Sequence, residues 1–253
     1  MAGPSDDPDR TSASGGDYIA GDKVGGDKVL GDKIIFVRGR EVRLPGPETV
    51  RRHLDAIREN PNYNRWVDDR YVGGVALPMR VAPYPTKLDH EPQRVDLLQA
   101  ISDAQHCIIL GEPGIGKTTS LERLMWAAAM RGDLMPVYVR LAEYKPDEGR
   151  TFPDLLRRGL NSEGVLHLPD PETLMLWLHN EEAPPILWLL LDGLNEARPD
   201  LVPSLLEAIH SHSRDFPAHR LALTCRTADW GNILNWPAWE VQELVDEAQR
   251  WGR

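Results

Sequence analysis

Apolar and polar positions alternate along residues 106–244 in blocks that predict strands and helices in turn. Short apolar runs typical of buried strands occupy residues 106–110, 135–141, 186–192, 220–225 and 239–244. Segments with apolar residues three or four positions apart, typical of amphipathic helices, lie between them at residues 119–130, 151–160, 170–180 and 204–212. This alternation indicates a parallel sheet with helices on both faces. We therefore predict an α/β, doubly wound core.

The chain before this core has a different character. Its first residues are acidic and rich in Ser, Gly and Pro, and they contain no apolar run. Further on, Val50, Leu54 and Ile57 share one face of a predicted helix over residues 46–60. We expect a disordered tail at 1–15, a repeat at 16–35, an accessory helix with an extended linker at 36–83, and the main domain at 84–253.

A Gly-Asp pair recurs every five residues near the N-terminus, at Gly16-Asp17, Gly21-Asp22, Gly26-Asp27 and Gly31-Asp32. Glycine at every fifth position disfavours a helix, and an odd period sends the apolar residue of each unit to alternating faces of a flat strand. A turn-rich coil suits this pattern better. Two interpretations remain open: a flexible linker, or a short repeat that stacks on another chain, since isolated repeat units have no neighbour to bury their apolar faces against.

Composition narrows the class of function. The chain has 253 residues with 29 Lys and Arg against 39 Asp and Glu, a net charge of −10, so a general nucleic-acid binder is not expected. The only cysteines, Cys107 and Cys225, lie in apolar segments and fit a reducing cytoplasm. No apolar run approaches the length of a membrane span. We expect a cytoplasmic protein without membrane contact.

A phosphate-binding motif follows the first predicted strand. The stretch GEPGIGKTT matches the pattern G-x-x-x-x-G-K-[ST] between a strand and a helix, so its backbone N–H groups can surround phosphate oxygens. Lys117 is expected to reach the β- and γ-phosphates, Thr118 to ligate Mg²⁺, and Thr119 to assist at the α-phosphate. The expected nucleotide-binding residues are Gly111, Glu112, Pro113, Gly114, Ile115, Gly116, Lys117, Thr118 and Thr119.

Acidic residues follow the strand predicted at residues 186–192. Asp192 ends this strand, on the same sheet edge as the phosphate loop, and is expected to hold Mg²⁺ together with Thr118. Glu196 lies in the loop beyond it, where its carboxylate can orient or deprotonate the attacking water. A surface glutamate at the start of the next helix is the alternative. Asn195 cannot act as a base.

Arg226 follows the strand at residues 220–225, which in this sheet type runs between the phosphate-loop strand and the Asp192 strand. Its guanidinium can stabilise or sense the γ-phosphate, or it can pair with a surface acid instead. His210 and His212 are two positions apart on a predicted helix, so they do not face one metal ion, and we expect both on the helix surface.

The stretches LGEPGIGKTT, WLLLDGLNEA and LALTCRTADW resemble the Walker A, Walker B and first sensor motifs of NACHT-domain NTPases, bacterial members above all. The resemblance implies a P-loop NTPase that binds ATP, or GTP, with Mg²⁺, and that changes from a closed monomer to an oligomer when triggered. It implies catalytic roles for Lys117, Glu196 and Arg226. Bacterial relatives often serve in antiviral defence, and short repeats of this kind precede some of them.

Two features depart from that pattern. Asn195 stands where many members carry a second acid, which affects the expected rate of hydrolysis more than nucleotide binding. The chain also ends at Arg253, before any helical or winged-helix module or repeat sensor, so we expect those modules to be missing. Two alternatives therefore remain: a non-catalytic scaffold that assembles through the repeat, and a motor or loader of the AAA+ type.

Overall fold

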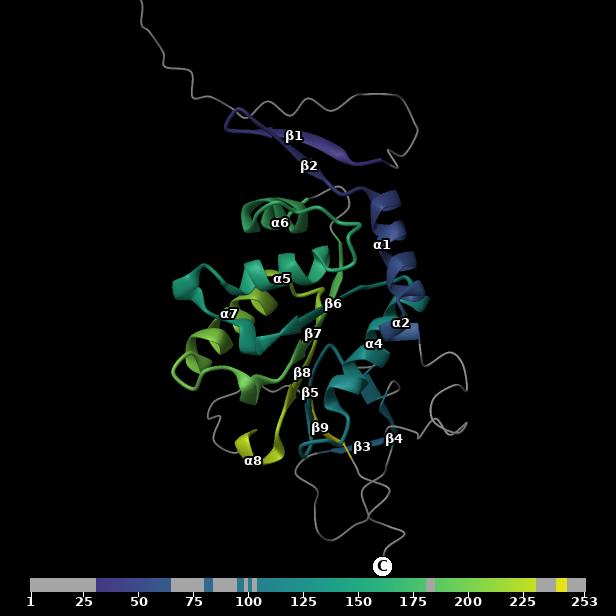
Figure 1. Cartoon of the computed structure of the whole chain (residues 1–253), viewed down its shortest axis with the longest axis vertical. Coiled ribbons are helices and arrows are strands. Elements are labelled where there is room, and N and C mark those ends of the chain that lie inside the picture. Colours follow the sequence, from purple (N-terminus) through teal and green to yellow (C-terminus); the bar gives the residue numbers. More distant parts are fainter. Residues whose placement is uncertain are drawn as a thin grey trace, which may run out of the picture.

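The computed structural model describes residues 31–64, 80–83, 95–97, 100–101, 104–180, 185–230 and 240–244 (Figure 1). The predicted tail and the first three Gly-Asp units lie outside these ranges, as does most of the predicted linker. The fourth unit, at Gly31-Asp32, lies inside them.

The core is a sheet in which β5 lies at the centre of the strand order β4-β3-β9-β5-β8-β7-β6. The bounds are β3 Arg80–Pro83, β4 Val95–Asp96, β5 His106–Leu110, β6 Met135–Arg140, β7 Leu187–Asp192, β8 Arg220–Cys225 and β9 Glu240–Leu244. The strands from β9 to β6 pair in parallel, whereas β3 pairs antiparallel with both β9 and β4. The predicted parallel sheet is confirmed, and β8 lies between β5 and β7 as expected.

Helices cover both faces of this sheet, which confirms the doubly wound α/β class. Helices α1, α2 and α4 pack together on one side, and α5, α6 and α7 lie on the other (Figure 1). Their bounds, with the short α8 and the 3₁₀ turns, are α1 Pro47–Glu59, α2 Pro61–Asn64, α4 Lys117–Arg131, η1 Leu141–Glu143, η2 Pro146–Glu148, α5 Phe152–Asn161, α6 Pro171–Leu178, η3 Leu194–Glu196, α7 Val202–Asp215 and α8 Thr227–Trp230. None of the helices in the described ranges has the length and apolarity needed to cross a membrane.

The central strands are apolar because both of their faces are covered. Every residue of β7 before Asp192 is buried, and Trp188 of this strand is among the largest fully enclosed side chains. Burial on both faces explains why β7 reads as a continuous apolar run rather than as an alternating one. Asp192, at the end of the strand, is half-buried. Strand β7 thus presents a carboxylate at the point where its apolar run ends.

A β-hairpin that the sequence analysis did not predict precedes α1. Strands β1 (Lys33–Val37) and β2 (Arg40–Leu44) are antiparallel and are joined through Arg38 and Gly39, whose φ angles are 49° and 79°. Positive φ at both loop residues is typical of the tight turn that matches strand twist. Val42 and Leu44 bury one face of the hairpin in the core. The hairpin begins inside the predicted repeat segment, so that segment is not a uniform coil.

The fourth Gly-Asp unit caps helix α1. Asp32 Oδ1 accepts hydrogen bonds from the Gly46 N–H at 3.0 Å and from the Thr49 hydroxyl at 2.7 Å. A carboxylate at a helix N-terminus satisfies amide donors and suits the helix dipole. A Cβ on Gly46 would lie 2.0 Å from the Gly31 carbonyl oxygen, so only glycine admits this approach. In this unit the aspartate has a structural role.

Two further expectations differ from the structure. Strand β3 joins the main sheet, although it precedes the predicted domain boundary at residue 84. His212 is buried, with 6% of its surface exposed, which makes the expectation of a surface histidine wrong. Its ring packs against Phe216, and its Nε2 lies 3.0 Å from Nδ1 of His219. The helix pattern alone could not show that the start of β8 lies beside the end of α7.

Candidate nucleotide and magnesium site

The predicted phosphate loop joins the end of β5 to the start of α4. Gly114 and Gly116 have φ angles of 81° and 101°, in a region of backbone conformation that residues with a Cβ rarely adopt. These turns let the chain fold back, and the Ile115 N–H donates to the Glu112 carbonyl oxygen at 3.3 Å. Helix α4 begins at Lys117, so the N–H groups of its first turn have no acceptor inside the helix and point toward the loop. This geometry suits an anion.

Lys117 lies within the loop that it is expected to serve. Its Nζ donates to the carbonyl oxygens of Gly111 at 2.8 Å and Glu112 at 3.0 Å. Burial lowers the pKa of Lys117 most, the positive charge of Arg226 lowers it further, and the negative charge of Asp192 acts in the opposite direction. Arg226 and Asp192 therefore both act electrostatically on Lys117. The fold brings these three predicted residues to one edge of the sheet.

The Asp192 carboxylate accepts hydrogen bonds on both oxygens. Its Oδ2 accepts from the hydroxyls of Thr118 at 2.8 Å and Tyr138 at 2.6 Å. Its Oδ1 accepts from the hydroxyl of Thr224 at 2.7 Å. Thr224 is fully buried, and its oxygen also accepts from the Gly193 N–H at 2.8 Å. Thr118 was predicted to lie beside Asp192, whereas the other two hydroxyls were missed.

The residues present fit a magnesium ion. Mg²⁺ prefers hard oxygen ligands and is usually bound in such sites by one carboxylate with phosphate and water oxygens. The Thr118 hydroxyl and the Asp192 carboxylate, which the resemblance assigns to Mg²⁺, lie in direct contact at the mouth of the phosphate loop. They would hold the ion between them and the phosphates.

Glu196 folds back over the residue that follows Asp192. A Cβ on Gly193 would lie 3.0 Å from the carboxyl carbon of Glu196 and 3.1 Å from its Oε2. Gly193 also has φ 74°, so glycine is favoured here both by the backbone and by the approach of Glu196. Glu196 is exposed at the end of η3. Its carboxylate therefore lies close to the strand end that carries Asp192, where solvent can reach it.

Asn195 and Arg226 link η3 to the end of β8. The Asn195 side-chain oxygen accepts from the Arg226 N–H at 3.2 Å. The Arg226 side chain is exposed, and no carboxylate in the described part of the chain forms an ion pair with it. The alternative of a strand-end arginine paired with a surface acid thus finds no support in these ranges. Asn195 thus contacts the residue after β8 through a hydrogen bond, and its neutral amide cannot act as a base.

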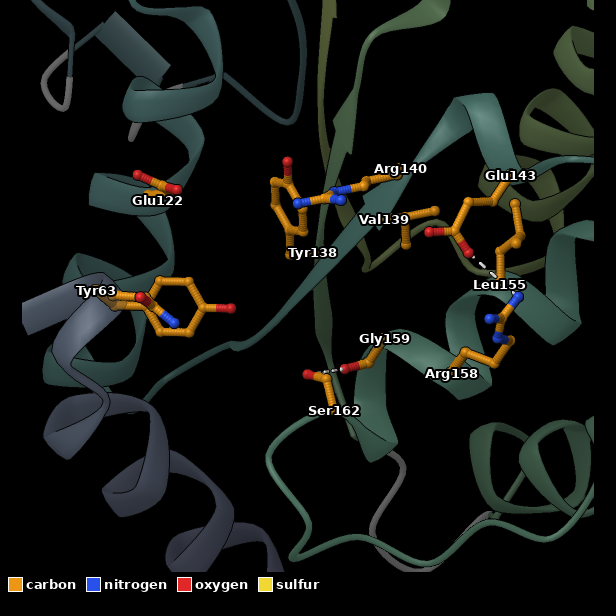
Figure 2. Close-up of a pocket in the computed structure, with 11 residues that line it drawn as sticks. Tyr63, Glu122, Tyr138, Val139, Arg140, Glu143, Leu155, Arg158, Gly159 and Ser162 are labelled. Carbon is orange, nitrogen blue, oxygen red and sulfur yellow. Dashed lines mark hydrogen bonds and ion pairs between the residues drawn. The ribbon is translucent and has the colours of Figure 1, made fainter. Parts of the chain in front are cut away.

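A cavity of about 500 Å³ opens beside β6, and Tyr138 is among the residues that line it (Figure 2). We call it the β6-edge cavity, and its lining includes Tyr63, Glu122, Tyr138, Arg140, Glu143 and Arg158. The Arg140 guanidinium lies near the Tyr138 hydroxyl and interacts with it electrostatically. Burial and the contact with Asp192 raise the pKa of Tyr138, so its hydroxyl stays protonated. Tyr138 therefore lines the cavity and contacts Asp192 through its hydroxyl.

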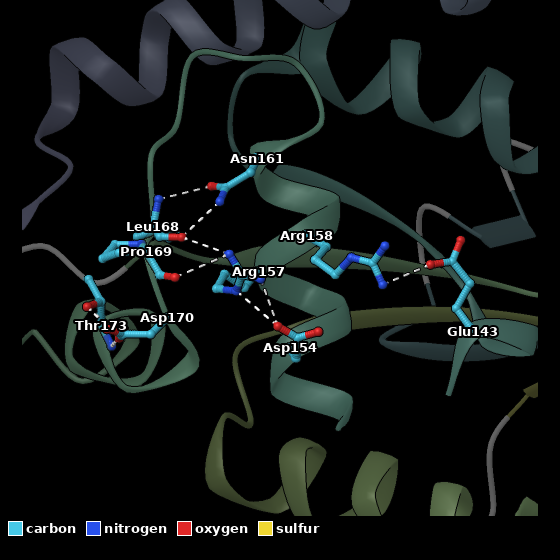
Figure 3. A network of polar contacts seen from close by, with 9 residues as sticks. All are labelled: Glu143, Asp154, Arg157, Arg158, Asn161, Leu168, Pro169, Asp170 and Thr173. Carbon is cyan, nitrogen blue, oxygen red and sulfur yellow. Dashed lines mark hydrogen bonds and ion pairs between the residues drawn. The ribbon is translucent and has the colours of Figure 1, made fainter. Parts of the chain in front are cut away.

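One wall of this cavity is helix α5, which a polar network holds in place (Figure 3). Arg157 bonds to Asp154 at 2.8 Å and to the Leu168 carbonyl oxygen at 3.1 Å. Asn161 donates to the same oxygen at 2.9 Å and accepts from the Leu168 N–H at 3.0 Å. Both helix residues therefore tie the loop after α5 to the helix by hydrogen bonds.

The comparisons with known proteins agree with this geometry. The NACHT domain family model matches residues 105–249. No curated protein matches the chain. Among solved structures, the chain is similar to Cdc6p from Pyrobaculum aerophilum, with 17% identity over 58% of this chain and 42% of that chain and a TM-score of 0.39. It is also similar to the cytoplasmic domain of the type VII secretion ATPase EccC of Thermomonospora curvata, with 16% identity over 68% and 22% of the two chains and a TM-score of 0.33.

A third similar structure is described as an ATPase, with 14% identity over 78% of this chain and 82% of that chain and a TM-score of 0.34. The chain spans less than half the length of the first two solved structures. TM-scores this low support no argument about function. The family match covers more than half of the 253 residues and contains the loop, the strand-end aspartate and the strand that carries Arg226. The chain belongs to the NACHT domain family of P-loop NTPases.

Proposed function

We propose that the chain is a Mg²⁺-dependent switch that binds ATP, hydrolyses it slowly and couples its nucleotide state to self-association. One observation carries the proposal: the Thr118 hydroxyl and the Asp192 carboxylate lie 2.8 Å apart beside a loop whose glycines turn backbone N–H groups inward. This places an anion site and a hard-cation site side by side, as phosphoryl transfer requires. ATP is proposed over GTP on the family resemblance.

Hydrolysis would divide its tasks among the residues of this edge. The loop N–H groups and Lys117 bind the phosphates and stabilise the charge that develops on the γ-phosphoryl group. Bound Mg²⁺ supplies charge neutralisation at the phosphate oxygens. Glu196 orients a water molecule and accepts its proton as the water attacks phosphorus and the bond to the ADP oxygen breaks. Arg226 stabilises the γ-phosphoryl charge or senses its presence.

The cellular location and the biological role of the switch are also proposed. The two cysteines are buried and do not form a disulfide, which suits the cytoplasm. The bacterial relatives that the sequence resembles often serve in antiviral defence, and we propose the same role here. In that role a trigger would release the closed form, and self-association would activate an effector.

The test measures phosphate release from ATP, bound nucleotide and mass in solution for the native chain and for Lys117→Ala, Asp192→Ala and Glu196→Gln. The matched control is Glu207→Gln, which replaces an exposed glutamate of α7. We expect Lys117→Ala to lose nucleotide, Glu196→Gln to keep nucleotide but lose phosphate release, and the control to behave like the native chain. Release that survives Glu196→Gln would remove Glu196 from the reaction.

A non-catalytic scaffold is the second candidate, and one contact favours it. Asn195 stands where many relatives carry a second acid, and its side chain is engaged by the Arg226 N–H. A chain that binds ATP and assembles without releasing phosphate would fit this candidate. In that case the bound nucleotide recovered from the protein should remain ATP, whereas the switch predicts accumulation of ADP.

A further inference from the structure

Asp192 is held from the two strands that flank its own strand. Tyr138 lies on β6 and Thr224 on β8, and each donates to a different oxygen of the carboxylate. A carboxylate with a fixed donor on each oxygen cannot rotate about its last bond without losing one of them. The orientation of the carboxylate is therefore fixed before a metal ion binds, so less conformational entropy is lost on binding.

The direction of the hydrogen bond on the β6 side is determined by its chemistry. An ionised carboxylate only accepts, so the Tyr138 hydroxyl must donate its single proton to Asp192 Oδ2. The Arg140 guanidinium lies near the same hydroxyl and interacts with it electrostatically. Its positive charge favours the hydroxyl oxygen over the proton, so the proton is directed toward Asp192. Arg140 also pairs in register with Asp192 across β6 and β7.

We propose that Tyr138 is a positioning residue for magnesium, and that its hydroxyl fixes Asp192 in the orientation that binds the ion together with Thr118. Arg140 supports it electrostatically, because its positive charge lies near the hydroxyl oxygen. The proposal rests on the proposed function, because it concerns the ion that accompanies the nucleotide. Tyr138 touches neither nucleotide nor water in this role and acts only through Asp192.

The surroundings of Tyr138 make a clean substitution possible. The tyrosine is half-buried and lines the β6-edge cavity (Figure 2). Tyr138→Phe removes one oxygen and keeps the ring. Tyr63→Phe is the matched control, because Tyr63 lines the same cavity but its hydroxyl interacts electrostatically with Glu163 and forms no hydrogen bond with Asp192 in the described part of the chain. The two variants differ only in whether the lost hydroxyl reaches the magnesium site.

The experiment measures the affinity of the full chain for ATP in EDTA and across a Mg²⁺ titration, together with phosphate release at saturating ATP. For Tyr138→Phe we expect the half-saturating Mg²⁺ concentration to rise about tenfold, the change expected when one hydrogen bond to a charged group is lost. Affinity in EDTA should stay at the native value, and excess Mg²⁺ should restore release. Arg140→Gln should shift the half-saturating concentration in the same direction by roughly threefold.

An unchanged half-saturating concentration in Tyr138→Phe overturns the proposal, as does an equal shift in Tyr63→Phe. A parallel loss of affinity in EDTA would also overturn it, because a general disturbance of the fold affects binding with and without the ion. If the native chain binds ATP but releases no phosphate, the proposed hydrolysis fails. The Mg²⁺ dependence of ATP affinity still decides the role of Tyr138 in that case.

Discussion

Replacing His53 tests how burial makes the stability of this fold depend on pH. His53 lies on the inner face of α1, where 1% of its surface is exposed. Its Nδ1 has no hydrogen-bond partner in the part of the chain that the structure describes. Burial lowers the pKa of His53 from 6.5 to about 4. His53→Leu removes the titrating group and leaves a side chain of similar size that suits the apolar surroundings.

The size of the effect follows from the two pKa values. Above pH 6.5 the imidazole is neutral in both states and does not affect the pH dependence. As the pH falls from 6.5 toward 4, the unfolded chain binds a proton that the folded chain excludes, so the free energy of unfolding decreases. For one such group the loss between pH 8 and pH 5.5 is about 1.4 kcal/mol. His53→Leu should not show this loss, and at pH 8 its free energy of unfolding should be at least as large as that of the native chain.

Urea unfolding followed by circular dichroism measures the free energy of unfolding of each protein at pH 8 and at pH 5.5. His212 and His219, whose pKa values burial lowers to about 3 and about 4, destabilise both proteins alike at low pH and cancel in the comparison. The control is His167→Gln, at an exposed position before α6, which should retain the full native loss. Equal losses in His53→Leu and in the native chain would refute the reasoning.

Three further predictions concern the backbone and the polar contacts around the site. Gly193→Ala places a Cβ 3.0 Å from the carboxyl carbon of Glu196, and we expect phosphate release to fall roughly a hundredfold while nucleotide binding is kept. An unchanged release rate would show that Glu196 can move without consequence. Gly159→Ala places a Cβ 2.6 Å from the Tyr138 carbonyl oxygen, so urea unfolding should show a loss of about 1–3 kcal/mol. Thr224→Val leaves a carboxylate oxygen and the Gly193 N–H without their partner, with an expected loss of about 2 kcal/mol that Thr224→Ser should largely recover.

The sheet and the phosphate loop could be predicted because their signals are local. A strand buried on both faces is apolar at every position, as at residues 187–191, and this does not depend on which strand lies beside it. The loop motif likewise carries its own geometry, since Gly114 and Gly116 supply the left-handed turns and Lys117 begins the helix. The position of Asp192 followed from these two facts together.

The contacts that hold Asp192 could not be predicted in the same way. Tyr138 and Thr224 are distant from it in sequence and meet it only because β6 and β8 flank β7 in the sheet. Strand order suggests which residues are neighbours, but the register decides which side chains share an edge. The hairpin was missed for a related reason. Its turn at Arg38-Gly39 is a weak signal, and its first strand begins within a five-residue repeat that does not have strand periodicity.

The contacts of α1 give the N-terminal segment a physical connection to the phosphate loop. At its start, the Asp32 carboxylate of the last Gly-Asp unit accepts from Gly46 and Thr49. Near its end, Arg58 donates through Nε and Nη2 to the Ala129 carbonyl oxygen in the last turn of α4, at 2.8 and 2.6 Å. The opposite end of α4 carries the N–H groups of the phosphate loop. A positive charge at the C-terminal end of a helix and an anion at its N-terminal end both interact favourably with the helix dipole. Arg58 and a bound phosphate would therefore stabilise the same helix. Displacement of α1 would therefore remove a stabilising contact from the C-terminal end of the helix that begins at the phosphate loop.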